Sequence, residues 1–258
     1  MLLDLTHLEP AHIDAKLPDI TEFARTYLGI EPYTEPVPVY PPTAHYAMGG
    51  IPTNVAGEVL RNETDVIKGL YAAGEVACVS VHGSNRLGTN SLLDINVFGK
   101  RAGRSAAAYA AEAAFVEIPA NPAATVEAEL ETIRTRPDGE RVADIRKALQ
   151  ETMDANAQVF RTEESLTQAL ADVKALQKRF QAVSVQDKSR TFNTDLLEAV
   201  ELGFLLDIAE TVVVGALNRK ESRGGHFRED YPKRETRATC GTPWRTAARS
   251  RARPAVVR

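Results

Sequence analysis

Between residues 123 and 220, apolar residues recur about every 3.6 positions, which is the period of an α-helix with one apolar face. Three such stretches are separated by short polar segments. Their apolar stripes are Val142, Ile145, Leu149 and Met153; Leu166, Leu170, Val173, Leu176 and Phe180; and Leu197, Val200, Phe204, Ile208 and Val212. Three amphipathic helices with short connections predict an antiparallel helical bundle.

The chain before residue 119 follows a different pattern. Residues 19–29 predict a short helix that ends at Gly29. Five prolines within residues 31–43 exclude a helix there. Short apolar runs then alternate with glycines, and the run 69–73 resembles a buried strand of an α/β sheet.

An apolar, alanine-rich helix is predicted from about residue 91 to residue 114. Asn90 or Ser91 is the expected N-cap, because both residue types accept hydrogen bonds from the first turn. Gly99 and Gly103 are four residues apart and predict close packing of this helix against the sheet.

The composition is that of a soluble globular protein, with 258 residues, 43% hydrophobic residues and a net charge of -4. No apolar run is long enough to span a membrane, and the first residues lack the basic region of a signal peptide. Two cysteines, Cys78 and Cys240, predict neither a disulfide framework nor a metal site, which favours a reducing, cytoplasmic compartment. The mild acidity argues against nucleic acid as the main partner.

Residues 83–94 (GSNRLGTNSLLD) contain the strongest candidate for chemistry, Arg86. An arginine offers paired donors to a carboxylate and stays charged. The helix that begins near Ser91 would direct free N–H groups to the same place, which suits a carboxylate substrate or a reduced flavin. The alternative is a surface salt bridge.

Two other residues give weaker signals. His45 precedes Gly49 and Gly50 and could offer a proton or hydrogen bond to a ligand that approaches the backbone closely. Glu75 follows Gly74 at a predicted strand end, where an acid can accept from ribose or ribityl hydroxyls. Each could equally be a structural or turn residue.

Residues 221–232 (ESRGGHFREDYP) predict a tight turn in which Arg223 or Arg228 pairs with acids. A structural or interdomain role is favoured for His226. His82 is expected to support the loop that carries Arg86.

Three segments together, HYAMGGIPTN, GLYAAGEVACVSVHGSNRLGTNSLLD and ESRGGHFREDYP, occur in the order found in the flavoprotein subunits of succinate dehydrogenase and fumarate reductase. The chain resembles this family from about Leu2 to Arg234. The resemblance implies the C-terminal part of a Rossmann-like FAD-binding domain, α/β in class, followed by an antiparallel helical bundle. It implies oxidation of succinate to fumarate by hydride transfer to FAD, or the reverse. It also implies an iron–sulfur subunit and membrane-anchor subunits as partners, passage of electrons to quinone, and a peripheral place on the inner face of the membrane.

The resemblance assigns roles to individual residues. The family's dicarboxylate-binding histidine and arginine correspond to His45 and Arg86. Its FAD contacts correspond to Gly74, Glu75, Ser91 and Leu92.

The chain also departs from the family. It contains no GxGxxG segment for the FAD pyrophosphate. In the family, the histidine that attaches flavin covalently and the proton-transfer arginine both lie upstream of the part that matches Leu2. We therefore expect no catalytic residue in this chain, no tight FAD binding and no turnover by the chain alone. A partial sheet would also leave apolar surface exposed, so we expect poor solubility.

The predicted domain order has four parts. Residues 1–43 are the end of a substrate-capping domain and a linker, 44–118 the FAD-binding part, 119–233 the helical bundle, and 234–258 a basic tail with seven arginines and one acid. We expect this tail to be disordered rather than to bind nucleic acid or anionic lipid. Codons for residues 239–246 can be chosen that read VRHTMAY in another frame, so the tail is also predicted to be a frameshift product.

Three alternatives stay open. Fumarate reductase fits as well as succinate dehydrogenase, because the direction of the reaction depends on the redox partners. L-aspartate oxidase shares two of the patterns, but its loop usually resembles NRLASNSLLE, whereas this chain reads NRLGTNSLLD. The third is a non-catalytic remnant that acts as a helical interaction module.

Overall fold

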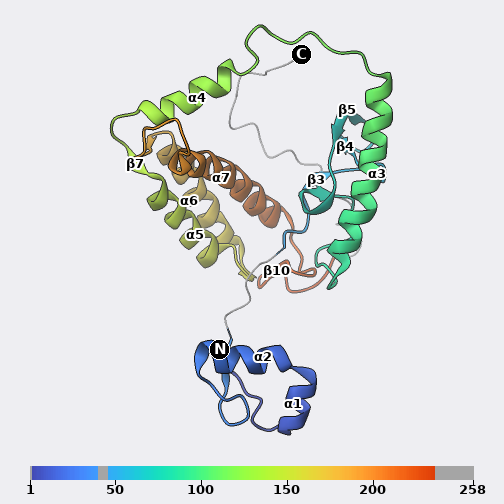
Figure 1. The fold of residues 1–258 in the computed structure, drawn as a ribbon, viewed down its shortest axis with the longest axis vertical. Coiled ribbons are helices and arrows are strands. Elements are labelled where there is room, and N and C mark those ends of the chain that lie inside the picture. The colour runs from blue at the N-terminus through green and yellow to red at the C-terminus, as the bar shows by residue number, and fades with distance from the viewer. Residues whose placement is uncertain (1, 40–45, 236–258) are drawn as a thin grey trace. The chain divides into compact units, whose positions relative to one another are not determined.

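The computed structural model describes residues 2–39 and 46–235. The chain divides into two compact units, Met1–Ala47 and Met48–Arg258, and each is described by itself (Figure 1). The predictions for His45, for Cys240 and for nearly all of the basic tail lie outside the described residues. Within the described residues, no helix combines the length and the apolar character needed to cross a membrane.

The described residues of the first unit form two short helices and one strand pair. The helices are α1 (Pro10–Lys16) and α2 (Pro18–Phe23), and α2 continues into the π-helical turn η1 (Ala24–Leu28). Gly29 ends this helix at φ +64°, a backbone conformation that glycine adopts without strain, so the predicted stop is confirmed. Strand β1 (Leu2–Leu3) pairs antiparallel with β2 (Val37–Pro38).

The three helices predicted for the second half of the chain are present in the second unit. They are α5 (Val142–Asn156), α6 (Glu163–Phe180) and α7 (Thr194–Asn218), and they pack side by side (Figure 1). A fourth helix that was not predicted, α4 (Ala124–Thr135), contacts α7. The shared core comprises Val142, Ile145, Leu149, Val173, Leu176, Val183, Val185, Ala199, Leu202, Leu206 and Ala209.

The apolar stripe predicted for α7 is the wrong face of that helix. Leu197, Phe204 and Ile208 are exposed, whereas the opposite face, which includes Leu202 and Leu206, is buried. The helix is apolar all round, so its period alone does not choose a face. The buried face carries small alanines that allow α7 to approach its neighbours closely, and this packing decides the orientation.

The strands of the second unit form two-stranded pairs among the described residues. The pairs are β3 (Ile51–Pro52) with β6 (Ala77–Cys78), β4 (Glu58–Leu60) with β5 (Val66–Tyr71), β7 (Glu140–Arg141) with β9 (Val183–Ser184), and β8 (Phe160–Arg161) with β10 (Phe227–Arg228). The β4–β5 pair is antiparallel and the other three are parallel.

A strand is present at the predicted run, as β5, but the prediction that it is buried is wrong. Strand β5 runs antiparallel to β4, and its Leu70 is 48% exposed. One face of β5 lies against the helix α3 (Asn90–Glu112), where the Tyr71 hydroxyl donates to the Ser105 carbonyl at 3.3 Å. Its residues are intermediate or exposed, so the strand is not enclosed in a sheet with both faces covered.

Helix α3 occupies the predicted range, but two predictions about it are wrong. Its N-cap is Thr89, at φ +64° and without a side-chain capping bond. The predicted caps have other partners: the Asn90 side chain contacts His82, and the Ser91 hydroxyl accepts from Arg86. A Cβ added to Gly99 or Gly103 would meet nothing within 4 Å, so neither glycine is needed for packing. The close approach is made instead by Gly57, where a Cβ would collide with Ala102 of α3.

Candidate functional site

Gly50 and the strand that follows it lie against the GEVAC segment. Strand β3, directly after Gly50, pairs parallel with β6, and the Thr53 N–H donates to the Cys78 carbonyl at 3.2 Å. A Cβ at Gly50 would collide with the Val76 carbonyl, so only a glycine permits this approach. Two of the three segments that suggested the family are therefore neighbours in the fold.

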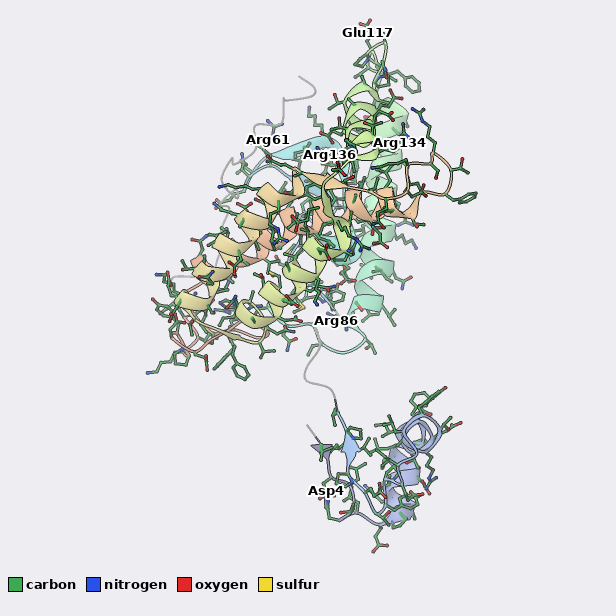
Figure 2. All side chains as sticks on the ribbon, turned by 90° about the vertical axis from the view of Figure 1, so that its left-hand side faces the viewer. Asp4, Arg61, Arg86, Glu117, Arg134 and Arg136 are labelled. Atoms are coloured by element: carbon green, nitrogen blue, oxygen red, sulfur yellow. The ribbon has the colours of Figure 1, made fainter. Side chains whose placement is uncertain are left out.

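Arg86 lies on the loop that leads into α3 (Figure 2). Its Nη1 donates to the Ser91 hydroxyl at 2.6 Å, and the side chains of both residues are partly buried. Ser91 is in the first turn of a 23-residue helix, whose N-terminus carries a partial positive charge. The structure thus places a guanidinium and a helix N-terminus together, and this combination favours an anion.

His82 fastens this loop to α3, as expected. Its Nδ1 accepts from the Asn90 amide at 3.2 Å and its Nε2 lies 2.9 Å from an Asp94 carboxylate oxygen, so Nε2 carries the proton and donates it to Asp94. Asp94 is 5% exposed and was not among the predicted site residues. Its signal in the sequence was an acid within an otherwise apolar helical turn.

The predicted cofactor contacts lie beside the same helix end. Gly74 is buried at φ +76°, where a Cβ would lie 3.1 Å from the Ile95 side chain of α3. It begins the 3-10 turn η2 (Gly74–Val76), which contacts α3 and leaves Glu75 exposed. Leu92, in the first turn of α3, is 59% exposed. An acceptor for hydroxyls, an apolar side chain and a helix N-terminus are therefore gathered in one part of the unit, a set that fits the polar chain and the ring of a flavin.

The ESRGGHFREDYP segment forms the predicted turn with paired charges. Arg223 donates to Glu221 at 3.0 Å, and Arg228 donates to Asp230 at 2.7 Å and to Glu163 at 3.0 Å. Arg228 is fully buried, and its bond lowers the pKa of Asp230 to about 2. The expectation that these arginines pair with acids is confirmed.

His226 is partly buried inside this turn, and both of its ring nitrogens are bonded. Burial lowers the pKa of His226, the bond to the Arg219 carbonyl opposes this, and the charges of Arg161, Arg219 and Arg228 lower the pKa further. Its Nδ1 accepts from Arg161 at 2.9 Å, so its Nε2 must carry the proton that it donates to the Arg219 carbonyl at 3.0 Å. These contacts agree with a structural role rather than proton transfer.

No three histidine, cysteine or acidic side chains in the described part of the chain are grouped so as to hold a metal ion.

Comparison with known proteins gives two family matches. Residues 1–92 match the family described as "FAD binding domain", and residues 146–253 match "Fumarate reductase flavoprotein C-term". The second match extends into the segment for which we predict a frameshift, and sequencing of the coding DNA remains the test of that prediction.

Individual relatives and structures agree with these matches. The chain is 47% identical to the succinate dehydrogenase flavoprotein subunit of Rickettsia felis over 91% of its length, and 44% identical to the fumarate reductase flavoprotein subunit of Mycobacterium tuberculosis over 90%. An Escherichia coli quinol fumarate reductase chain superimposes with a TM-score of 0.82 at 41% identity over 92% of this chain, and the Mycobacterium smegmatis Sdh1 complex in its apo form with 0.79 at 31% over 91%.

These findings first define a class, the flavoproteins, because residues 1–92 match the "FAD binding domain" family and the relatives are flavoprotein subunits. The chain belongs more narrowly to the family of succinate dehydrogenase and fumarate reductase flavoprotein subunits. It spans about 40% of the length of the curated relatives it matches.

Proposed function

We propose that this chain supplies part of the dicarboxylate and flavin site of a succinate dehydrogenase or fumarate reductase flavoprotein. The observation that carries the proposal is the Arg86–Ser91 pair at the N-terminus of α3. Such a pair holds a fixed positive charge at one place, and a dicarboxylate needs a charge of this kind at one or both of its ends.

Each residue has a defined task in this proposal. Arg86 binds one carboxylate of succinate or fumarate, and Ser91 orients its guanidinium. His45 binds the same substrate. Gly74 fixes η2 so that Glu75 could accept from ribityl or ribose hydroxyls. Ser91 and Leu92 would contact the flavin, and the first turn of α3 would favour negative charge there. When bound, FAD supplies the hydride acceptor or donor.

The domain organisation and the context of the chain belong to the same proposal. Residues 44–118 would be the C-terminal part of a Rossmann-like FAD-binding domain and residues 119–233 an antiparallel bundle. The partners would be an iron–sulfur subunit and membrane-anchor subunits, with the protein peripheral on the inner membrane face. In these 258 residues no GxGxxG segment is present, so we propose that the chain alone neither holds FAD tightly nor turns over. A stoichiometric flavin absorbance spectrum of the purified chain would contradict this point.

Calorimetric titration of the purified chain with succinate tests the role of Arg86. Arg86→Lys keeps the charge but loses the paired donors, and we expect it to weaken binding about tenfold or more. Arg101→Lys is the matched control, because Arg101 lies on α3, the helix that follows the Arg86 loop, and donates to the Val55 carbonyl instead. Equal succinate affinity of the Arg86→Lys variant and the unmodified chain would overturn the assignment.

Loss of succinate affinity in both variants would point to a general effect of helix α3 rather than to Arg86. Co-purification with an iron–sulfur subunit would support a surviving subunit role, whereas isolation as a free chain would favour the remnant.

A further inference from the structure

We propose that the turn Arg223–His226 is a positioning element that holds the Arg86 loop in place through Ser84. The inference deepens the proposed function and rests on it where succinate affinity is concerned. The turn and the loop are far apart in the sequence, but their backbones are in direct contact: the Gly225 N–H donates to the Ser84 carbonyl at 2.8 Å. Ser84 is two residues before Arg86.

Gly224 makes this contact possible. It has φ +57°, and a Cβ added there would lie 2.6 Å from the Ser84 carbonyl oxygen, 2.7 Å from the carbonyl carbon and 2.8 Å from the hydroxyl oxygen. Two of these three atoms belong to the backbone, so no side-chain rotation relieves the overlap. Any other residue at position 224 must displace either the turn or the arginine loop.

The turn is the more firmly held of the two. Arg223 and His226 exchange backbone hydrogen bonds of 2.8 Å and 3.1 Å across it. Outside the turn, the Arg223 side chain donates to the fully buried Glu221, and both ring nitrogens of His226 are bonded. A clash at position 224 should therefore move the Ser84 loop, which has positive φ angles at Gly83 and Thr89 and an exposed Leu87.

The turn also lies near Met48. A Cβ at Gly225 would lie 3.6 Å from Met48 Cε and 3.3 Å from the Ser84 carbonyl oxygen. Met48 belongs to the HYAMGG segment that also contains His45. The turn therefore lies next to both the loop that carries Arg86 and the side chain of Met48.

The test compares Gly224→Ala with Gly29→Ala. Gly29 has a similar φ of +64°, but a Cβ there would meet nothing within 4 Å, so the control reproduces the backbone strain without the clash. Gly225→Ala is the milder second variant, because its closest contact is 3.3 Å and it keeps the N–H. Amide hydrogen exchange of residues 83–90 and succinate affinity are measured for each chain.

We expect Gly224→Ala to speed exchange of residues 83–90 and to weaken succinate binding, each by about tenfold or more, because small misplacements of a binding group have large effects. Exchange within α5, α6 and α7 should stay unchanged, which separates local displacement from general destabilisation. Gly225→Ala should have the same effect to a smaller extent. If Gly224→Ala does not fold, the Gly225→Ala variant alone tests whether the turn holds the loop. Unchanged exchange of the loop in both variants would overturn the proposal.

A double-mutant cycle tests whether the turn acts through Arg86. In an Arg86→Lys background, Gly224→Ala should have little additional effect on succinate affinity, because the group that it displaces is already impaired. Full additivity would show that the turn does not act through Arg86. If the unmodified chain does not bind succinate, the proposed function fails for this chain, while the exchange measurement still decides whether the turn holds the loop.

Discussion

The helical region 142–218 and the loop-and-helix region 74–112 belong to the same unit but are stabilised in different ways. The helices α5, α6 and α7 bury a continuous apolar core between them. Around α3, by contrast, Leu92, Leu93 and Ile95 are exposed, and the well-buried positions include polar or small residues such as Asp94 and Ala102. The first region is held by apolar packing, whereas the second depends on specific hydrogen bonds and glycine contacts. The proposed site lies in the second.

The largest effect should come from the apolar core. Leu202→Ala, at a fully buried position of α7, should lower the free energy of unfolding by about 3 kcal/mol, because it removes buried methyl groups and leaves a cavity. Leu197→Ala on the same helix is the control, since Leu197 is 57% exposed and should cost less than about 1 kcal/mol. Urea denaturation of both variants measures the difference, and equal losses would contradict the assigned orientation of α7.

The second-largest effect on stability should come from removal of the buried charge of Arg228. Arg228→Met removes the ion pairs with Asp230 and Glu163, of which Glu163 keeps a pair with Lys220 at 3.6 Å, and it removes the bond to the Ala216 carbonyl near the end of α7. We expect the free energy of unfolding to fall by about 2 kcal/mol. This is less than for a fully buried ion pair, because both acids are partly exposed to solvent. Arg190→Met provides the matched comparison, since its pair with Glu131 is exposed and contributes under about 1 kcal/mol. A smaller loss for Arg228→Met than for Arg190→Met would argue against the buried pair.

The two helix starts should respond in opposite directions. Thr162 accepts from the Ser165 N–H in the capping box of α6, so Thr162→Ala should cost about 1 kcal/mol. Thr89 begins α3 at φ +64° without a capping bond, so Thr89→Gly should stabilise the chain by up to about 1 kcal/mol. Thermal unfolding of both variants checks the signs, and destabilisation by Thr89→Gly would mean that Thr89 makes an essential contact.

Lowering the pH should reduce the stability of the segment 223–230 in two stages. The pKa of His226 is lowered by burial, so the unfolded chain binds its proton more readily and stability falls as the pH drops below about 6.5. The pKa of Asp230 is also lowered, to about 2, so its contribution is present above its ordinary pKa and is lost as the pH falls through about 2. Denaturation at a series of pH values should show the upper stage disappear in His226→Gln and the lower one in Asp230→Asn. Unaltered pH profiles would assign the acid sensitivity to other groups.

The sequence predicts the helices better than their packing. The stripe Val142, Ile145 and Leu149 fixes the buried face of α5, because polar residues occupy the other face. The same reasoning fails for α7, whose two faces are both apolar. Glycine spacing also misleads at Gly99 and Gly103, because a close approach depends on which segments meet in the fold, and here Gly57 meets Ala102.

The candidate site also contains residues that the sequence predicts and residues that only the fold brings together. The segment GSNRLGTNSLLD predicts both the candidate role of Arg86 and its position before a helix, because these follow from residue type and local turn signals. The roles of Asp94 and Gly224 could not be predicted in this way. The bond from His82 to Asp94 forms only once the first turns of α3 have folded, and the contact of Gly224 with Ser84 joins segments about 140 residues apart in the chain.

The central claim is that this chain supplies the dicarboxylate-binding arginine of a family flavoprotein, and a chimera tests it most directly. Residues 2–235 would replace the matching part of a full-length relative, such as one that is 47% identical, and succinate oxidation and bound flavin would be measured together. We predict an active, flavin-loaded chimera in which Arg86→Lys lowers kcat/KM about 100-fold while flavin content and the Arg101→Lys control stay unchanged. An Arg86→Lys chimera with undiminished kcat/KM would contradict the account.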